Sequence, residues 1–170
     1  MDDLFSAFVF EEQGCLQAVL HRLKYQGAAF IGEELGRAVA PSLPPRLVTL
    51  SAPLIVPVPL HRSKLRERGY NQSLEIGRGI AAATGLRVAA DLLLRARPTP
   101  SQTPLARAER RTNVAGAFAV RTRAPRALSR TPVLLVDDVI TTGATVTECA
   151  RVLRAAGAAP VFACSVALAA

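Results

Sequence analysis

The chain has 170 residues, of which 50% are hydrophobic and 20% charged, and its formal net charge is +8. This length and composition suit one compact domain, and no apolar run approaches the roughly 18–20 residues of a membrane-spanning helix. The start, MDDLFSAFVFEEQG, lacks the basic region of a secretory signal, so we expect a cytoplasmic protein without membrane insertion.

The cysteines argue against a zinc site. Cys15, Cys149 and Cys164 lie far apart and form no CxxC pair. Neither a zinc site nor a disulfide framework is therefore indicated, and buried free thiols are expected.

Positive charge is concentrated in the middle of the sequence. Residues 61–130 contain 15 basic and 4 acidic side chains, whereas residues 1–60 contain 4 basic and 6 acidic ones. A concentrated positive segment favours partners rich in phosphate. The alternative is a compositional bias toward arginine, because only two of the basic residues are lysines.

The first 45 residues are predicted to be mainly helical. Residues 8–10 fit a short strand, residues 15–25 place apolar side chains on one helical face, and residues 30–40 fit a second helix that stops at Pro41. The proline-rich segment PSLPPR then indicates a linker. The predicted boundary therefore separates residues 1–45 from a core of residues 46–170.

The core alternates predicted strands and helices. We expect strands at 54–59, 92–94, 116–120, 133–136 and 161–167, and helices at 72–84 and 144–156. Basic residues 61–71 are expected to form a loop, and residues 95–114 a long mobile excursion. This alternation predicts an α/β fold with a mainly parallel sheet and helices on both faces.

Two adjacent acids mark the end of the predicted strand at 133–136. VLLVDDVITTGATVTECARVL passes from that strand through Asp137 and Asp138 into a loop of small and hydroxyl residues, then into a helix. Ligands of open parallel sheets bind beyond the carboxyl ends of strands, and a helix start attracts phosphate. Carboxylates suit hydroxyl groups, so the stretch predicts a ribose 5-phosphate ligand. Its phosphate would contact Thr141, Thr142, Gly143, Ala144 and Thr145.

Other readings of this stretch meet specific objections. The loop has no lysine for a GxxxxGK[ST] phosphate loop and only one glycine for a GxGxxG dinucleotide fingerprint. A hydrolase with paired carboxylates would need a separated second acid, and none is evident. A plain strand–turn–helix with Asp138 or Thr142 as a cap remains the structural alternative.

The same residues resemble a known family. VLLVDDVITTGAT resembles the phosphoribosyl pyrophosphate (PRPP) motif of type I phosphoribosyltransferases. LHRLKYQG, VPVPLHRSKLRERGYNQS and PSQTPLARAERRTNVAGAF are similar to segments of the ComF family, also called GntX or competence-protein-F-like phosphoribosyltransferases. The resemblance implies a type I phosphoribosyltransferase fold with a small N-terminal helical hood over residues 1–45. Family members usually carry an N-terminal zinc finger, and this chain has no CxxC pair for one.

The resemblance also implies a reaction and a set of site residues. PRPP would lose pyrophosphate to a nitrogen acceptor such as a nucleobase, with Mg²⁺ as cofactor. Asp137 and Asp138 would hold the ribose hydroxyls and reach Mg²⁺ through water. The segment after the first core strand would bind pyrophosphate, through Pro59, Leu60, His61, Arg62, Lys64 and Arg66, with Arg68 as a further donor. A solvated basic face is the alternative for these cations.

Two further segments have expected roles. Residues 99–113 resemble the flexible loop that closes over PRPP, which would make Arg107 and Arg110 catalytic, with Arg111 beside them. The alternative is an ordered surface helix with exposed arginines. In the hood, Tyr25 and Phe30 could stack on a base, but core packing is the expectation. Asn71 is expected to cap the helix at 72–84, while Gln72 could face the site.

Two functions remain open from the sequence. One is a Mg²⁺-dependent phosphoribosyltransferase, linked by family to competence and DNA uptake. The other is a non-catalytic PRPP-binding accessory protein that binds single-stranded DNA or competence partners. Few aromatic residues lie in the basic segment, so DNA binding would be mainly electrostatic.

Overall fold

A five-stranded parallel sheet forms the centre of the molecule, with strand order β1-β7-β6-β2-β3. The computed structural model describes residues 1–11, 14–49, 53–97, 114–121 and 128–169. The sheet strands are β1 (Leu4–Phe10), β2 (Leu54–Pro57), β3 (Arg87–Val88), β6 (Val133–Ile140) and β7 (Val161–Ala169). A separate antiparallel pair joins β4 (Leu93–Arg95) to β5 (Phe118–Val120).

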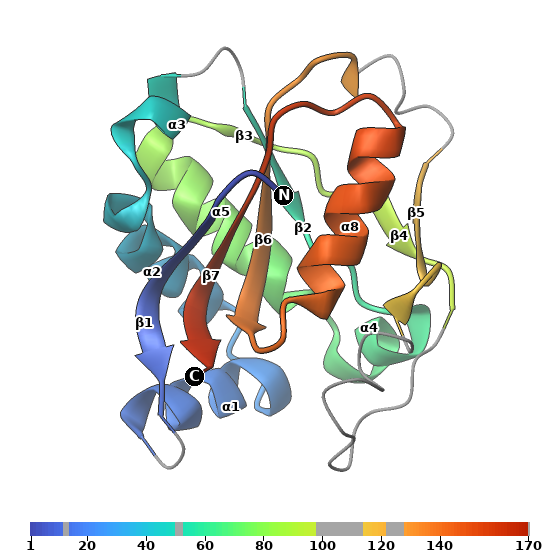
Figure 1. Ribbon diagram of the computed structural model, residues 1–170. Helices are drawn as coiled ribbons and strands as arrows, with labels where there is room; N and C mark the ends of the chain where they lie inside the picture. The colour runs from blue at the N-terminus through green and yellow to red at the C-terminus, as the bar shows by residue number, and fades with distance from the viewer. Residues whose placement is uncertain (12–13, 50–52, 98–113, 122–127, 170) are drawn as a thin grey trace.

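Helices cover both faces of this sheet (Figure 1). The described helices are α1 (Cys15–Tyr25), α2 (Phe30–Val39), the 3-10 helix η1 (Ala40–Ser42), α3 (Pro45–Thr49), α4 (Arg62–Arg68), α5 (Gln72–Thr84) and α8 (Ala144–Ala155). In Figure 1, α8 lies on one face, and α2, α3 and α5 lie on the other. The predicted α/β architecture is confirmed.

The central strand β6 explains why both faces need cover. Its residues Val133 and Leu135 belong to the core cluster shared with α8, whereas Leu134 and Val136 belong to the cluster shared with α5. Successive side chains of a strand point to opposite faces, so a continuous apolar run is buried on both. All four side chains are fully buried.

The N-terminal segment contributes to the same sheet and core. β1 is longer than predicted and pairs in parallel with β7, from Leu4 opposite Ala163 to Phe10 opposite Ala169. Helix α2 lies so close to α5 that a Cβ at Gly36 would stand 2.1 Å from the backbone oxygen of Ile76. The segment therefore begins with a sheet strand, and its helices pack directly on the core.

Two local predictions were wrong, and two predicted strands are present but arranged differently. The expected linker 41–46 contains η1 and the start of α3, and the expected basic loop contains α4. The expected strands at 92–94 and 116–120 pair with each other outside the main sheet. Most of the excursion predicted at 95–114 lies outside the described residues.

The arrangement brings several elements to the carboxyl ends of the strands. In Figure 1 the arrowheads of β1, β6 and β7 point toward the end of the molecule where α1 and α4 lie. β2 pairs with β6 only as far as Val136, so the flank of β6 is free of strand pairing on that side beyond this residue.

In the part of the chain described, no helix is long and apolar enough to cross a membrane.

Candidate functional site

Asp137 and Asp138 lie within the carboxyl-terminal half of β6. The sequence predicted that the strand would stop at Val136, but it continues through both acids to Ile140. Pairing with β7 continues along this extension, with Asp137 opposite Ser165. The acids are therefore held by sheet geometry, and Asp138 retains only 5% of its accessible surface.

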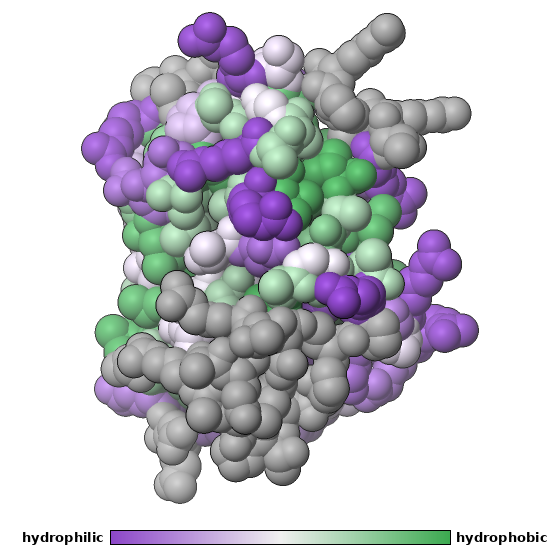
Figure 2. Space-filling view, turned by 45° about the vertical axis from the view of Figure 1, so that its right-hand side comes forward, coloured by the Kyte–Doolittle hydropathy of each residue, from purple (hydrophilic) through white to green (hydrophobic). Residues whose placement is uncertain are grey.

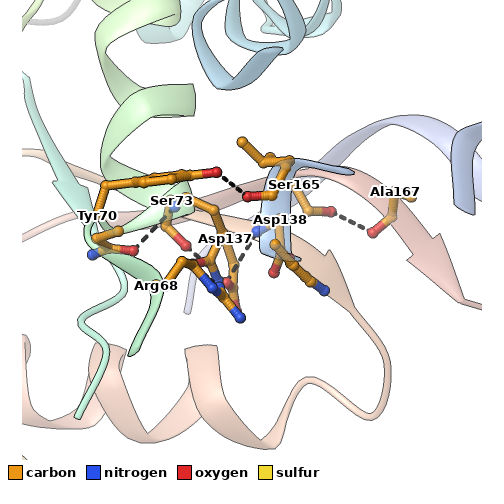
Figure 3. Close-up of polar contacts among 11 residues, drawn as sticks. Arg68, Tyr70, Ser73, Asp137, Asp138, Ser165 and Ala167 are labelled. Carbon is orange, nitrogen blue, oxygen red and sulfur yellow. Dashed lines mark hydrogen bonds and ion pairs between the residues drawn. The ribbon is translucent and has the colours of Figure 1, made fainter. Parts of the chain in front are cut away.

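Helix α5 supplies a partner for the first acid. Ser73 Oγ donates a hydrogen bond to Asp137 Oδ1 over 3.1 Å, and the Asp138 amide donates to the same oxygen over 3.0 Å. Figure 3 shows Ser73 approaching Asp137 from one side, with Ser165 on the β7 side of the pair. Burial, followed by the negative charge of Asp138, raises the pKa of Asp137 to about 8. The acidic pair thus carries less than two full negative charges near neutral pH.

Helix α1 supplies a partner for the second acid. Lys24 Nζ lies 2.6 Å from Asp138 Oδ2, with the lysine side chain 26% exposed and the aspartate side chain 8% exposed. Burial alone would raise the pKa of Asp138, but the Lys24 ammonium outweighs burial and holds that pKa below its ordinary value. Asp138 is therefore ionised and paired across the site.

The predicted phosphate loop follows directly and enters α8. Thr141 is exposed, while Thr142, Gly143, Ala144 and Thr145 are half-buried. Gly143 has a φ of +72°, and a Cβ there would meet nothing within 4 Å. No side chain caps the start of α8, although Thr142 Oγ1 accepts a hydrogen bond from the Ala144 amide over 3.4 Å. This open helix start suits an anion.

The predicted pyrophosphate segment connects β2 to α4. Pro59, Leu60 and His61 are half-buried, and His61 caps α4 by accepting a hydrogen bond from the Ser63 amide. Arg62 and Arg66 are exposed, whereas Lys64 Nζ pairs with Glu67 over 2.8 Å. The Val58 amide donates a hydrogen bond to the Val136 carbonyl over 2.9 Å, which fixes the start of this segment to β6 just before the acidic pair.

The turn from α4 to α5 is fixed by hydrogen bonds. Asn71 caps α5, as predicted, by accepting from the Ser73 amide over 3.1 Å, and its side-chain amide donates to the Val58 carbonyl over 3.0 Å. Arg68 donates to Gln72, which is buried and paired in this way, and the Arg68 guanidinium stacks 5.6 Å from the ring centre of Tyr25. These contacts hold Ser73 in place beside Asp137.

Two aromatic residues of the hood lie differently from their prediction. Tyr25 and Phe30 were expected in the core, but they are 62% and 69% exposed. The reason is that α1 and α2 bury their other faces, through residues such as Leu20, Leu23 and Val39.

The arginines predicted to be catalytic, Arg107 and Arg110, lie outside the described residues with Arg111.

The acidic pair fits only one kind of magnesium site. Among the described residues, no group of three or more His, Cys, Asp or Glu side chains could hold a metal. Mg²⁺ commonly keeps several waters and binds through one or two carboxylates together with substrate phosphates. Asp137 and Asp138 fit that role, although Lys24 already stands against Asp138.

Two known proteins are similar in sequence to most of this chain. Competence protein F of Haemophilus influenzae is 31% identical over 145 residues, which cover 84% of this chain and 63% of that protein. DNA utilization protein YhgH of Salmonella typhi is 32% identical over 149 residues, or 86% of this chain and 64% of that protein. Competence protein F and DNA utilization protein YhgH are therefore homologues of this chain over most of its length. It spans less than two thirds of the length of these curated relatives, and no family model matches it.

Solved structures confirm the predicted fold of this chain. Glutamine PRPP amidotransferase from B. subtilis, in complex with ADP and GMP, superimposes with a TM-score of 0.53 and 22% identity over 82% of this chain and 26% of that chain. An allosteric regulatory enzyme of purine biosynthesis superimposes with a TM-score of 0.52, 20% identity and the same coverage. The chain has the type I phosphoribosyltransferase fold.

Two site residues of this chain are not evident from the sequence alone. Lys24 was read only as part of a hood helix, and Ser73 only as part of a helix start. Their partners lie far away along the chain, and 64 positions separate Ser73 from Asp137. One signal was available for Lys24, because it is one of only two lysines in an arginine-rich chain.

Proposed function

We propose that this protein binds PRPP and catalyses Mg²⁺-dependent transfer of its phosphoribosyl group to a nitrogen acceptor such as a nucleobase. The observation that carries the proposal is the continuous path from the acidic pair on β6, through the loop at Gly143, to the uncapped start of α8. A ribose 5-phosphate has hydroxyls at one end and a phosphate at the other, which matches these two features. The type I phosphoribosyltransferase fold supports the same proposal.

The ribose end of the ligand would meet the two carboxylates. An ionised Asp138 accepts hydrogen bonds from hydroxyl groups, and Lys24 keeps it ionised. Asp137 has one oxygen engaged with Ser73 and the Asp138 amide, and these bonds would hold the carboxyl group in place while it binds a ribose hydroxyl. The 5-phosphate would accept from backbone amides at the start of α8 and from the threonine hydroxyls of the loop.

The pyrophosphate end would lie toward the start of α4. Exposed Arg62 and Arg66 are close in sequence to the turn that follows β2, and arginine binds phosphate groups through two parallel hydrogen bonds. Bound Mg²⁺ would neutralise the leaving pyrophosphate. The protein would then contribute positioning and charge stabilisation for a transition state with positive charge on the ribose ring.

Calorimetric titration of PRPP tests the binding step. The parent chain and an Asp137→Asn, Asp138→Asn double variant are titrated with and without Mg²⁺, and folding of the variant is checked by circular dichroism. We expect binding by the parent that strengthens with Mg²⁺ and is lost in the folded variant. Pyrophosphate release is then measured with purine, pyrimidine and pyridine acceptors, and transfer is refuted if the bound PRPP reacts with none of them.

A second candidate is a PRPP-binding accessory protein that holds single-stranded DNA or a competence partner. It is favoured by the exposed arginines of α4 and by relatives named competence protein F and DNA utilization protein. Above the grey atoms in Figure 2, hydrophilic side chains lie in separate groups with apolar ones between them. A fluorescence titration with single-stranded DNA at rising salt decides the matter. Steep salt dependence supports this candidate, and no binding at low salt excludes DNA.

A further inference from the structure

The last turn of α1 is tied to the site through three consecutive residues. The Leu23 carbonyl accepts a hydrogen bond from the Tyr70 hydroxyl, Lys24 pairs with Asp138, and the Tyr25 ring lies under the Arg68 guanidinium. The first contact holds the backbone directly before Lys24, and the third holds the side chain directly after it. The end of α1 that carries Lys24 is therefore held against the site by contacts on both sides of this residue.

The charge balance of the acidic pair gives Lys24 a specific role. Two adjacent carboxylates on a largely buried strand repel each other and lose hydration, so an ionised Asp138 needs a nearby positive charge. Lys24 Nζ provides that charge at 2.6 Å. Lys24 belongs to the last turn of α1, and a cation near the carboxyl end of a helix is favoured by the helix dipole.

We propose that Lys24 is the resident counter-ion of the ribose site, taking at Asp138 the place that a divalent cation would otherwise fill. The inference rests on the proposed function and extends it. Because the counter-charge belongs to the protein, Asp138 is paired and oriented before any ligand arrives. The ribose 5-phosphate part of the ligand then binds without metal, and the metal requirement belongs to the pyrophosphate alone.

Ribose 5-phosphate is the probe that separates these contributions, because it lacks the pyrophosphate. Its binding to the full chain is measured by calorimetry in excess EDTA and in millimolar Mg²⁺, beside PRPP. The variants are Lys24→Met, which removes the charge at similar length, and Lys24→Arg, which keeps it. Arg37→Met is the matched control, because Arg37 is a surface cation on α2 paired with Glu34 over 2.5 Å.

The parent should bind ribose 5-phosphate with affinities that differ by less than about twofold between EDTA and Mg²⁺. In EDTA, the affinity of Lys24→Met for ribose 5-phosphate should be lower than that of the parent by about tenfold or more. Mg²⁺ should restore most of this affinity. Lys24→Arg and Arg37→Met should resemble the parent in both conditions. Recovery by Mg²⁺ is the decisive readout, because damage to the fold would lower the affinity in both conditions.

Three results would overturn the inference while leaving the proposed function intact. The parent could require Mg²⁺ for ribose 5-phosphate, a result that needs no variant. Lys24→Met could keep the parent's affinity in EDTA, or it could lose the same affinity with and without Mg²⁺. If the parent binds neither ribose 5-phosphate nor PRPP under either condition, the proposed function is refuted and the inference is refuted with it.

Discussion

Ser73 donates a hydrogen bond to Asp137 over 3.1 Å and so joins the first turn of α5 to the carboxyl end of β6. The bond forms at the point where β2 no longer pairs with β6. Ser73 is fully buried, and Asn71 fixes its backbone from the preceding turn. The start of α5 therefore lies beside the part of β6 that has no pairing with β2, and it orients one of the two site carboxylates.

Replacing Ser73 with alanine should affect ligand binding more than it affects folding. The Ser73→Ala variant removes one hydrogen bond to a carboxylate, for a stability loss of about 1 kcal/mol. Without the bond, Asp137 also loses an interaction that lowers its pKa. We expect PRPP affinity to fall by about threefold to tenfold in calorimetry. Ser42→Ala, at an exposed position, is the control, and an unchanged affinity in Ser73→Ala would show that this bond does not orient Asp137.

Stability should depend on pH through Asp137. Burial, with the charge of Asp138, raises the pKa of this carboxyl group from 3.8 to about 8. A raised pKa favours the neutral acid in the folded state, so the stabilisation is complete below the unfolded-state pKa and is lost as pH rises toward about 8. Asp137→Asn keeps an acceptor oxygen for Ser73 but cannot ionise.

Chemical denaturation of Asp137→Asn at several pH values measures this effect. We expect the free energy of unfolding to exceed that of the parent by about 1 kcal/mol near pH 8 and to match it near pH 4. The value is set well below the full linkage energy because Asp137 is only partly buried, so that water screens part of its charge. Asp91→Asn, at an 86% exposed side chain, should show no such trend. A pH-independent difference in Asp137→Asn would contradict the raised pKa.

Local sequence patterns predicted much of the fold and failed where tertiary contacts decide. The helices at 15–25 and 72–84 match the structure at both ends, because apolar spacing and the terminal glycines at 27 and 85 are local signals. Helix α4 was missed because RSKLRER has no apolar face to reveal it. The pairing of β4 with β5 was missed because it joins segments separated by the residues of a long connection.

The site was predictable in so far as it is continuous in sequence. Asp137, Asp138 and the loop at Gly143 form one stretch, and strand–loop–helix chemistry alone points to a ribose phosphate. Lys24 belongs to a different helix, and nothing near it in sequence shows that it meets a carboxylate. Its role depends on the parallel pairing of β1 with β7, which brings α1 to the carboxyl ends of the strands.

Gly143 offers a test of the phosphate loop with a matched control. Gly143 has a φ of +72° and Gly85 a φ of +75°, and a Cβ at either would meet nothing within 4 Å. Alanine at each position should therefore cost a similar ~1 kcal/mol of strain. Gly85 ends α5, whereas Gly143 precedes α8. We expect only Gly143→Ala to weaken ribose 5-phosphate binding in calorimetry. Equal losses of affinity in the two variants would show that this loop does not bind the phosphate.

The pair of Lys24 and Asp138 should show strong energetic coupling. Lys24→Met leaves an ionised carboxylate with an 8% exposed side chain without its cation, which should cost about 2–3 kcal/mol of unfolding free energy. Asp138→Asn should cost less, because the 26% exposed lysine can turn toward water.

In the Asp138→Asn background the Lys24→Met change should cost less than about 1 kcal/mol, since no buried charge remains to be compensated. Urea denaturation of the parent, the two single variants and the double variant gives the coupling energy directly. Acid should reduce the cost of Lys24→Met alone, because protonation removes the unpaired charge of Asp138. Additive effects across the four proteins would mean that the ion pair does not hold Asp138 in its charged form, and that α1 is anchored by Tyr70 and Arg68 instead.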